Sequence, residues 1–160
     1  MSRRVALIVL SDRAAGGLRP DACIPLMREA LGPGYEIVRE LVIPDDPGAL
    51  QAELIDLADR SGADLILTSG GTGLSPRDRT PQATMAILDY EVPGIVEAIR
   101  AASVPHVKTA MLSRAVAGVR HRTLIVNLPG SPKAVEESLA VVLPVIPHAL
   151  ELLADRVSDG

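Results

Sequence analysis

The chain has 160 residues and a formal net charge of −4, which predict a single domain over residues 1–160 and argue against a nucleic-acid-binding surface. It has no Phe or Trp and only two Tyr, so its core must be aliphatic and base stacking on aromatic platforms is excluded as a binding mode. Its single cysteine, Cys23, excludes an intramolecular disulfide and a cysteine-rich zinc site, and it fits a reducing, cytoplasmic environment.

The first half of the chain alternates strand and helix patterns. Residues 5–10 form a run of leucine and β-branched residues that predicts a strand buried on both faces, and the run is too short for a signal peptide or a membrane span. A flexible segment over residues 14–20 is expected next, followed by helical spacing over residues 21–31. Partial alternation over residues 35–43 predicts an outer strand, and spaced leucines predict an amphipathic helix over residues 50–61.

The second half continues this alternation and adds a hairpin. A short apolar run over residues 64–68 predicts a third buried strand. Residues 116–119 and 123–128 both predict strands, and the three residues between them favour a tight antiparallel hairpin. Four further stretches have helical character: residues 81–90, residues 95–102, residues 131–142 and a last helix that begins at Pro144.

Strands that alternate with helices predict a three-layer α/β/α sandwich with a mainly parallel sheet, which the hairpin makes mixed. In such sheets ligands bind outside the carboxyl ends of the strands. Polar residues follow the predicted strands at that edge: Ser11-Asp12-Arg13, Asp45-Asp46, Ser69 to Gly73, and Asn127 to Ser131. The sequence therefore predicts one crevice lined by two glycine-containing loops and several carboxylates.

The loop after the third strand is the most distinctive stretch of the chain. Three glycines fall within residues 70–73 and allow a sharp turn and close approach of a ligand to the backbone. Arg77 can bind phosphate in a fork, and Asp78 can hold a hard cation. Thr80 as N-cap and Pro81 at the first helical position predict a helix N-terminus there, which suits an anion. Against this, glycine-rich turns occur without ligands, and the loop is neither a Walker loop nor a G-x-G-x-x-G loop.

Two interpretations of the acidic residues follow from the sequence. Asp45 and Asp46 fit helix capping and Mg²⁺ binding equally well, because acids favour helix N-termini and Mg²⁺ takes one or two carboxylates beside nucleotide phosphates. Asp78 fits a capped turn as well as phosphoryl chemistry. Lys133, at the start of a helix, could meet a phosphate, but the residue pattern alone favours a solvated helix start.

Two strings resemble those of a known family. SGGTGLSPRDRTPQAT, over residues 69–84, closely resembles the signature loop of the molybdopterin adenylyltransferase family, and Asn127 to Lys133 resembles its second glycine loop at a fitting spacing. The resemblance extends from Leu7 to about Leu153. It implies transfer of AMP from Mg-ATP to the terminal phosphate of molybdopterin, with release of pyrophosphate, in molybdenum cofactor biosynthesis.

The resemblance also implies roles for individual residues. Asp45 and Asp78 match the family's carboxylates in magnesium–nucleotide chemistry, so they are expected to be catalytic and to hold Mg²⁺. The residues expected to bind molybdopterin or ATP are Ser11, Asp12, Ser69, Gly70, Gly71, Thr72, Gly73, Ser75, Arg77, Ser113, Asn127, Pro129, Gly130, Ser131 and Lys133. A homotrimer and contact with a molybdenum-insertion enzyme are further implications, whereas nucleic acid and membrane partners are not expected.

Some features depart from the family pattern, and other functions remain compatible with it. Arg79 replaces a small apolar residue, and Ala22-Cys23 replaces a glycine-containing stretch, which puts a role for Asp21 in doubt. One alternative is a non-catalytic molybdopterin-binding or scaffold module, against which the retained Asp45 and Asp78 argue. Another is a hydrolase or amidase on the same fold, against which the Ser-Pro-Arg-Asp continuation of the glycine loop argues.

Overall fold

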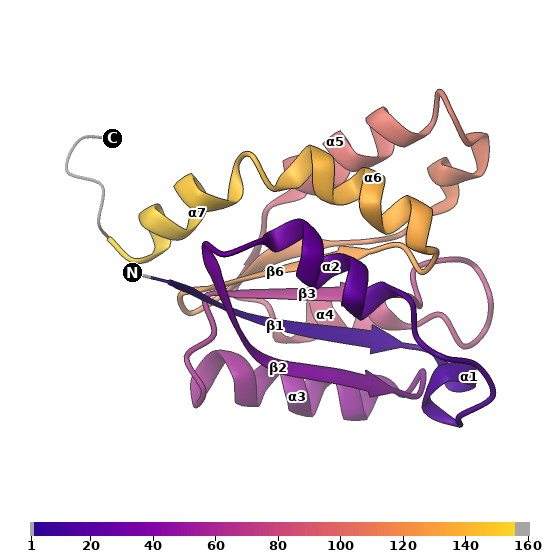
Figure 1. The fold of residues 1–160 in the computed structure, drawn as a ribbon, viewed down its shortest axis with the longest axis horizontal. Helices are drawn as coiled ribbons and strands as arrows, with labels where there is room; N and C mark the ends of the chain where they lie inside the picture. Colours follow the sequence, from indigo (N-terminus) through magenta and orange to yellow (C-terminus); the bar gives the residue numbers. More distant parts are fainter. Residues whose placement is uncertain (1, 156–160) are drawn as a thin grey trace.

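The computed structural model describes residues 2–155 and contains one six-stranded sheet with helices on both faces (Figure 1). The strand order is β2-β1-β3-β6-β5-β4. The first four strands in this order are parallel, and β5 and β4 continue the sheet antiparallel to their neighbours. The strands are β1 (Arg3–Leu10), β2 (Tyr35–Ile43), β3 (Leu65–Ser69), β4 (Tyr90–Glu91), β5 (Ala117–Arg120) and β6 (Thr123–Leu128). The expected three-layer sandwich with a mixed, mainly parallel sheet is confirmed.

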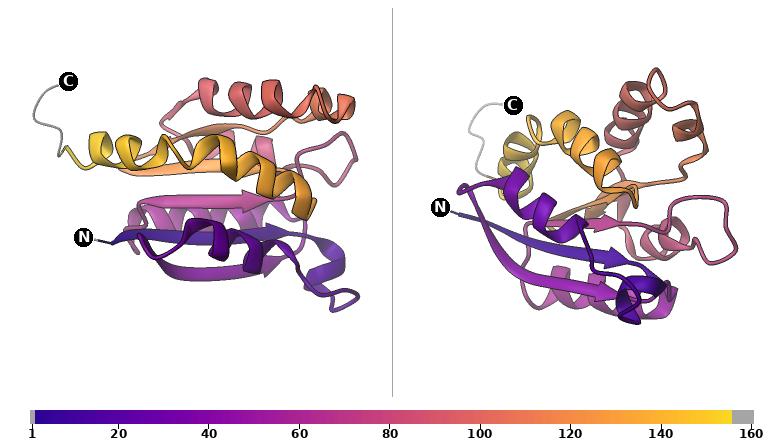
Figure 2. Two further views of the ribbon diagram at one scale, coloured as in Figure 1. Left: turned by 45° about the horizontal axis from the view of Figure 1, so that its top comes forward. Right: turned by 45° about the vertical axis from the view of Figure 1, so that its right-hand side comes forward.

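Both faces of the sheet are buried, as the apolar strand runs require. In β1 the side chains alternate between two core clusters, with Val5, Leu7 and Val9 in one and Ala6 and Ile8 in the other. The first core contains side chains of α2 (Cys23–Leu31), α5 (Pro93–Ser103), α6 (Pro132–Val142) and α7 (Ile146–Leu153), and the second contains those of α3 (Pro47–Asp59) and α4 (Thr80–Ile87). Figures 1 and 2 show these two helix layers on opposite sides of the strands.

The structure differs from the sequence-based elements where local hydrogen bonds compete with helical spacing. A short helix, α1 (Asp12–Ala15), extends into the segment expected to be flexible, residues 14–20, and its N-cap is Ser11, whose hydroxyl accepts a hydrogen bond from the Ala14 amide. The helix expected over residues 81–90 ends at Ile87, because the following residues pair with β5 as the edge strand β4.

Two helix starts also differ. The N-cap of α4 is Arg79 rather than Thr80, although Pro81 does lie in its first turn. The last helix begins at Ile146 rather than at Pro144. A 3-10 helix, η1 (Lys108–Leu112), occupies the segment before β5, where the residue pattern predicted no element. None of the helices within residues 2–155 is long and apolar enough to cross a membrane.

Candidate functional site

The main crevice lies where β1, β2, β3 and β6 end, as the parallel topology predicts. It has a volume of about 720 Å³ and is lined by the loops that follow these strands. Eleven of the residues expected to bind or catalyse line it: Ser11, Asp12, Asp45, Ser69, Gly70, Gly71, Ser75, Arg77, Asp78, Gly130 and Ser131. Residues that are far apart in the sequence are therefore brought to one place. We call this volume the crevice.

A second cavity adjoins the crevice, although the sequence predicted only one. Its volume is about 350 Å³, and α5, η1 and the start of α6 supply apolar walls that include Val96, Ile99 and Leu112. The remaining expected residues line it: Thr72, Gly73, Ser113, Asn127, Pro129 and Lys133, with Gly130 and Ser131 common to both volumes. We call this volume the apolar cavity. The second glycine loop, residues 127–133, forms a boundary shared by the two.

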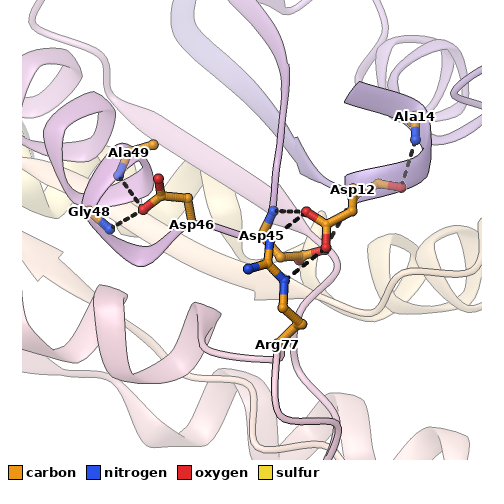
Figure 3. Close-up of polar contacts among 8 residues, drawn as sticks. Asp12, Ala14, Asp45, Asp46, Gly48, Ala49 and Arg77 are labelled. Carbon is orange, nitrogen blue, oxygen red and sulfur yellow. Dashed lines mark hydrogen bonds and ion pairs between the residues drawn. The ribbon is translucent and has the colours of Figure 1, made fainter. Parts of the chain in front are cut away.

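Four charged side chains line the crevice at the carboxyl ends of β1 and β2 and on the loop after β3: Asp12, Asp45, Arg77 and Asp78. Arg77 donates from Nε and Nη2 to the two oxygens of Asp12, over 2.9 and 2.8 Å (Figure 3). The Asp45 amide donates to Asp12 Oδ1 over 2.9 Å, and the Asp12 amide donates to Asp45 Oδ2 over 3.2 Å. The hydrogen bonds from Arg77 hold the pKa of Asp12 below its ordinary value. The loops after β1 and β2 are thus joined by two reciprocal contacts.

Asp45 is in a different electrostatic state from Asp12. Its pKa is raised, first by burial and then by the negative charges of Asp12 and Asp78, and these outweigh the hydrogen bond from the Asp12 amide. No guanidinium bonds to the Asp45 side chain among residues 2–155. Asp45 and Asp78 are therefore neighbouring carboxylates whose mutual repulsion a bound cation would relieve.

The structure separates the two acidic residues for which the sequence left capping and metal binding open. Asp46 is the N-cap of α3, and its Oδ1 accepts hydrogen bonds from the amides of Gly48 and Ala49 (Figure 3). Asp45, by contrast, lines the crevice. Capping is therefore confirmed for Asp46, and only Asp45 of the pair lines the crevice.

The residues present fit Mg²⁺ only as part of a nucleotide complex. Among the described side chains, no group of three or more His, Cys, Asp or Glu is arranged to hold a metal ion. Mg²⁺ is commonly held by one or two carboxylates together with substrate phosphates rather than by an all-protein cage. The pair Asp45 and Asp78 matches that mode of binding.

The glycines of the first glycine loop, residues 69–79, are required by backbone geometry and close packing. Gly70 and Gly71 have φ values of +101° and +70°, which residues with a side chain rarely adopt. A Cβ on Gly70 would collide with the carbonyl oxygen of Leu10, and one on Gly71 would collide with the hydroxyl of Thr80 and approach Asp45 Oδ1 to 3.3 Å. The loop backbone is therefore folded directly against the acidic cluster.

Two of the expected binding residues have side chains committed to the scaffold. Asn127 is fully buried, donates from Nδ2 to the hydroxyls of Thr68 and Thr84, and accepts at Oδ1 from the Val116 amide. Ser69 is also fully buried, and its hydroxyl donates to the Pro129 carbonyl over 2.8 Å. These side chains join the strands and the two glycine loops, so the structure gives them a supporting role rather than a free donor.

Among the cationic residues around the site, sequence reasoning missed Arg19 and did not predict the contacts that Arg114 makes. Arg13 lines the crevice, as its place directly after the first strand predicts, and Arg19, in the segment expected to be flexible, lines it too. Arg114 binds main-chain carbonyls of the first glycine loop. The signal for Arg114 was available, because an arginine directly before the apolar run of β5 needs hydrogen-bond acceptors once it is partly buried. Nothing in the sequence named those acceptors.

Cys23 lines the crevice but lacks the environment of a nucleophile. The thiol is buried, its pKa is raised by burial, and Sγ lies 3.5 Å from the Gly130 carbonyl to which it donates. Reactive cysteines have a lowered pKa in an electropositive environment. The position therefore fits packing behind the second glycine loop.

Comparisons with known proteins agree on one family. Residues 6–148 match the family model described as a probable molybdopterin binding domain. The molybdopterin adenylyltransferase of Escherichia coli strain K12 is 43% identical over 140 residues, which are 85% of this chain and 71% of the relative. The molybdopterin adenylyltransferase of Helicobacter pylori strain 26695 is 37% identical over 153 residues, which are 93% of this chain and 86% of the relative. The crystal structure of the molybdopterin biosynthesis enzyme MoaB from Thermus thermophilus is 51% identical, with a TM-score of 0.91 over 96% of this chain and 97% of that chain.

Proposed function

This chain belongs to the family of molybdopterin-binding domains, and we propose on that premise that it is a molybdopterin adenylyltransferase. It transfers AMP from ATP to the terminal phosphate of molybdopterin and releases pyrophosphate, a nucleotidyl transfer in molybdenum cofactor biosynthesis. Relatives that carry this name cover most of the chain at 37–43% identity. The retained carboxylates Asp45 and Asp78 favour this enzyme over a non-catalytic binding module.

The observation that carries the proposal is the pair of cavities on either side of the second glycine loop. The crevice offers Arg77 and the turn of the first glycine loop to a polyphosphate, whereas the apolar cavity offers a less polar volume to the pterin. Gly130 and Ser131 line both volumes, so the terminal phosphate of molybdopterin and the α-phosphate of ATP meet beside them.

The residues act by positioning and by charge rather than by covalent chemistry. The main chain of the first glycine loop approaches the phosphates closely, and Arg77 is accessible enough to leave Asp12 for a more highly charged partner, since its side chain is 61% exposed. Asp45 and Asp78 would hold Mg²⁺, which when bound supplies neutralisation of the phosphate charge. Burial of Asp45 strengthens its attraction for that cation.

The assembly and location proposed from the family resemblance are a homotrimer in the cytoplasm. Large apolar side chains on the surface, such as Met85, Tyr90 and Met111, support an oligomer because contact with another copy would cover them. A reduced, buried Cys23 is compatible with the cytoplasm. Sedimentation should give three times the chain mass of 16.8 kDa. A monomer at micromolar concentration would refute the trimer, and fractionation of cells tests the location.

The activity is tested by incubating the purified chain with ATP, Mg²⁺ and molybdopterin. The expected result is release of pyrophosphate in step with adenylyl-molybdopterin, with neither product when molybdopterin is omitted. A chain that binds molybdopterin tightly but releases no pyrophosphate is the non-catalytic module instead. Pyrophosphate release that does not depend on molybdopterin would point to a nucleotide hydrolase.

A further inference from the structure

The first glycine loop projects beyond the strand ends (Figures 1 and 2). Residues 74–77 are exposed, whereas Gly73 and Asp78 on either side of them are half-buried. Asp78 closes a local turn, in which its amide donates to the Ser75 carbonyl over 2.9 Å and the Ser75 amide donates to Asp78 Oδ2 over 3.0 Å. These two bonds shape the turn, which is joined to the rest of the protein by the exposed Arg77–Asp12 fork and by the contacts at the two ends of the loop, where the Thr80 amide donates to the Gly71 carbonyl over 3.2 Å. Since Arg77 is proposed to leave Asp12 for a phosphate, the direction of the Asp78 carboxylate then depends on what holds the two ends of the loop.

Arg114 holds both ends. Its amide donates to the Thr72 carbonyl over 2.8 Å, and its Nε donates to the Gly73 carbonyl over 2.9 Å, at the end nearer β3. Its Nη2 donates to the Asp78 carbonyl over 2.6 Å, at the end nearer α4. One planar guanidinium thus bridges Gly73, in the first half of the loop, and Asp78, which lines the crevice.

Arg114 is itself held in a fixed segment. Arg100 of α5 donates from Nη1 to the carbonyls of Ser113 and Ala115, the two residues that flank Arg114, over 3.1 and 3.2 Å. The three acceptors of Arg114 are neutral carbonyls, so its contacts need no carboxylate from the crevice. The hydrogen bonds of Arg100 and Arg114 therefore connect α5 to the first glycine loop. They involve none of the charged side chains of Asp12, Asp45 and Arg77.

We propose that Arg114 is a positioning residue for the transfer reaction, because its forked contact with the loop backbone sets the direction of the Asp78 carboxylate. The inference rests on the proposed function, in which Asp78 acts on the metal–nucleotide complex. Lysine cannot replace the fork, because an ammonium is a single point donor and a guanidinium bridges two acceptors in a fixed plane. Misplacement of a reacting group by 1 Å can cost about 10²-fold in rate.

Steady-state kinetics of Arg114→Lys provide the main test. We expect kcat to fall by about 10- to 100-fold while the KM values for ATP and molybdopterin stay close to those of the parent, because the cavity walls remain. The matched control is Arg120→Lys, since Arg120 also donates to a main-chain carbonyl, that of Ile87, and forms a fork with Asp59 outside both cavities. The control should lose stability without losing kcat.

Chemical rescue separates positioning from a general loss of folding. Millimolar guanidinium should restore part of the turnover of Arg114→Ala by occupying the vacated position, and it should not change that of Arg120→Ala. Unchanged kcat in Arg114→Lys would overturn the proposal. So would an equal loss in the Arg120 control, which would mean that the effect follows from stability alone.

A measurement without chemistry distinguishes failure of this inference from failure of the proposed function. The Ser75 amide donates to the Asp78 carboxylate, so its hydrogen exchange reports whether that carboxylate stays in place. It should be slow in the parent and faster in Arg114→Lys, whether or not the parent makes adenylyl-molybdopterin. If Arg114→Lys does not fold, Arg100→Lys should speed the same exchange by loosening the segment that carries Arg114. Exchange that stays at the parent rate overturns the proposal.

Discussion

The two ends of the parallel strands each carry an arginine–aspartate fork, but the two forks have different surroundings. At the carboxyl ends, Arg77 binds Asp12, and at the opposite end Arg120 binds Asp59 with nearly the same distances. Arg120 also donates to the Ile87 carbonyl, and its side chain is 22% exposed, against 61% for Arg77. The Arg120 fork is therefore a structural clamp between α3, α4 and β5.

The crevice fork differs because two further carboxylates, Asp45 and Asp78, lie beside it, and neither forms an ion pair with any residue of the described range 2–155. Asp45 has a raised pKa there, while the pKa of Asp59 is lowered by its hydrogen bonds with Arg120. In this protein the arginine–aspartate pair that marks the candidate site is the one with unpaired carboxylates beside it and a cavity next to it. The following predictions test this distinction by changing corresponding positions at the two ends.

The largest effect is expected for Asp78→Asn. The change keeps the shape of the side chain and its turn but removes the charge that is proposed to hold the metal–nucleotide complex. Turnover should fall by about 10²–10³-fold, while molybdopterin binding and folding persist. Asp59→Asn is the control at the other end and should leave turnover unchanged. Product formation and molybdopterin binding are measured together, and near-normal turnover of Asp78→Asn would remove its catalytic role and shift the assignment to Asp45.

The next effect is expected for Gly71→Ala, compared with Gly62→Ala at the other end. Both glycines have positive φ, but a Cβ on Gly62 meets nothing within 4 Å, whereas one on Gly71 collides with Thr80. Gly62→Ala should cost only the backbone strain, about 1–2 kcal/mol, and keep full activity. Gly71→Ala should cost more and also weaken ATP binding. Denaturant titrations of both variants measure the free energy of unfolding, and ATP titrations measure the affinity for ATP. Equal free energies of unfolding would show that the collision with Thr80 is relieved by a small local shift.

A smaller effect is expected for Arg77→Met, which breaks the exposed fork in the crevice. Its stability should stay near that of the parent, because exposed ion pairs contribute little. The KM for ATP should rise, because the accessible guanidinium is then missing from the phosphate site. Arg120→Met should show the reverse, with lower stability and an unchanged KM. A parent-like KM in Arg77→Met would exclude a phosphate contact by Arg77.

The smallest effect is a pH-dependent gain in stability for Asp45→Asn. Burial and like charges raise the pKa of Asp45 in the folded state above its ordinary value of about 3.8. The stabilisation that the protonated Asp45 gives to the fold is therefore complete below pH 3.8 and is lost as the pH rises through the raised pKa. At neutral pH the parent therefore carries an unfavourable charge that Asn lacks, so the variant should be more stable there and lose this advantage in acid. Urea midpoints at several pH values measure it, and a constant difference across pH would contradict it.

The layers and the main crevice were predictable because they depend on local pattern and on general rules of topology. The apolar runs of β1, β3 and β6 predicted buried strands, and parallel strands place their carboxyl ends at one edge. Asp12, Asp45 and the first glycine loop follow those strands, so their meeting in space followed from the order of elements.

The remaining features depend on partners that are distant in sequence. The edge strand β4 forms because Tyr90 and Glu91 pair with β5. Helical spacing in the sequence predicted instead that the preceding helix continues through these two residues. The division into two cavities depends on where η1 and α5 pack. Arg114 could be recognised as needing acceptors, but Gly73 and Asp78 became its acceptors only through the fold.

The position of β3 in the sheet affects the protein while it is being made. In the finished sheet β3 lies between β1 and β6, and its side chains are all buried. A ribosome-bound chain that ends before Thr123 has β1, β2 and β3 but lacks β6, so one edge of β3 has no partner. Open apolar edges are templates for pairing between chains. A translational pause between β3 and β6 should therefore lower the yield of folded protein without altering the activity of the molecules that complete synthesis.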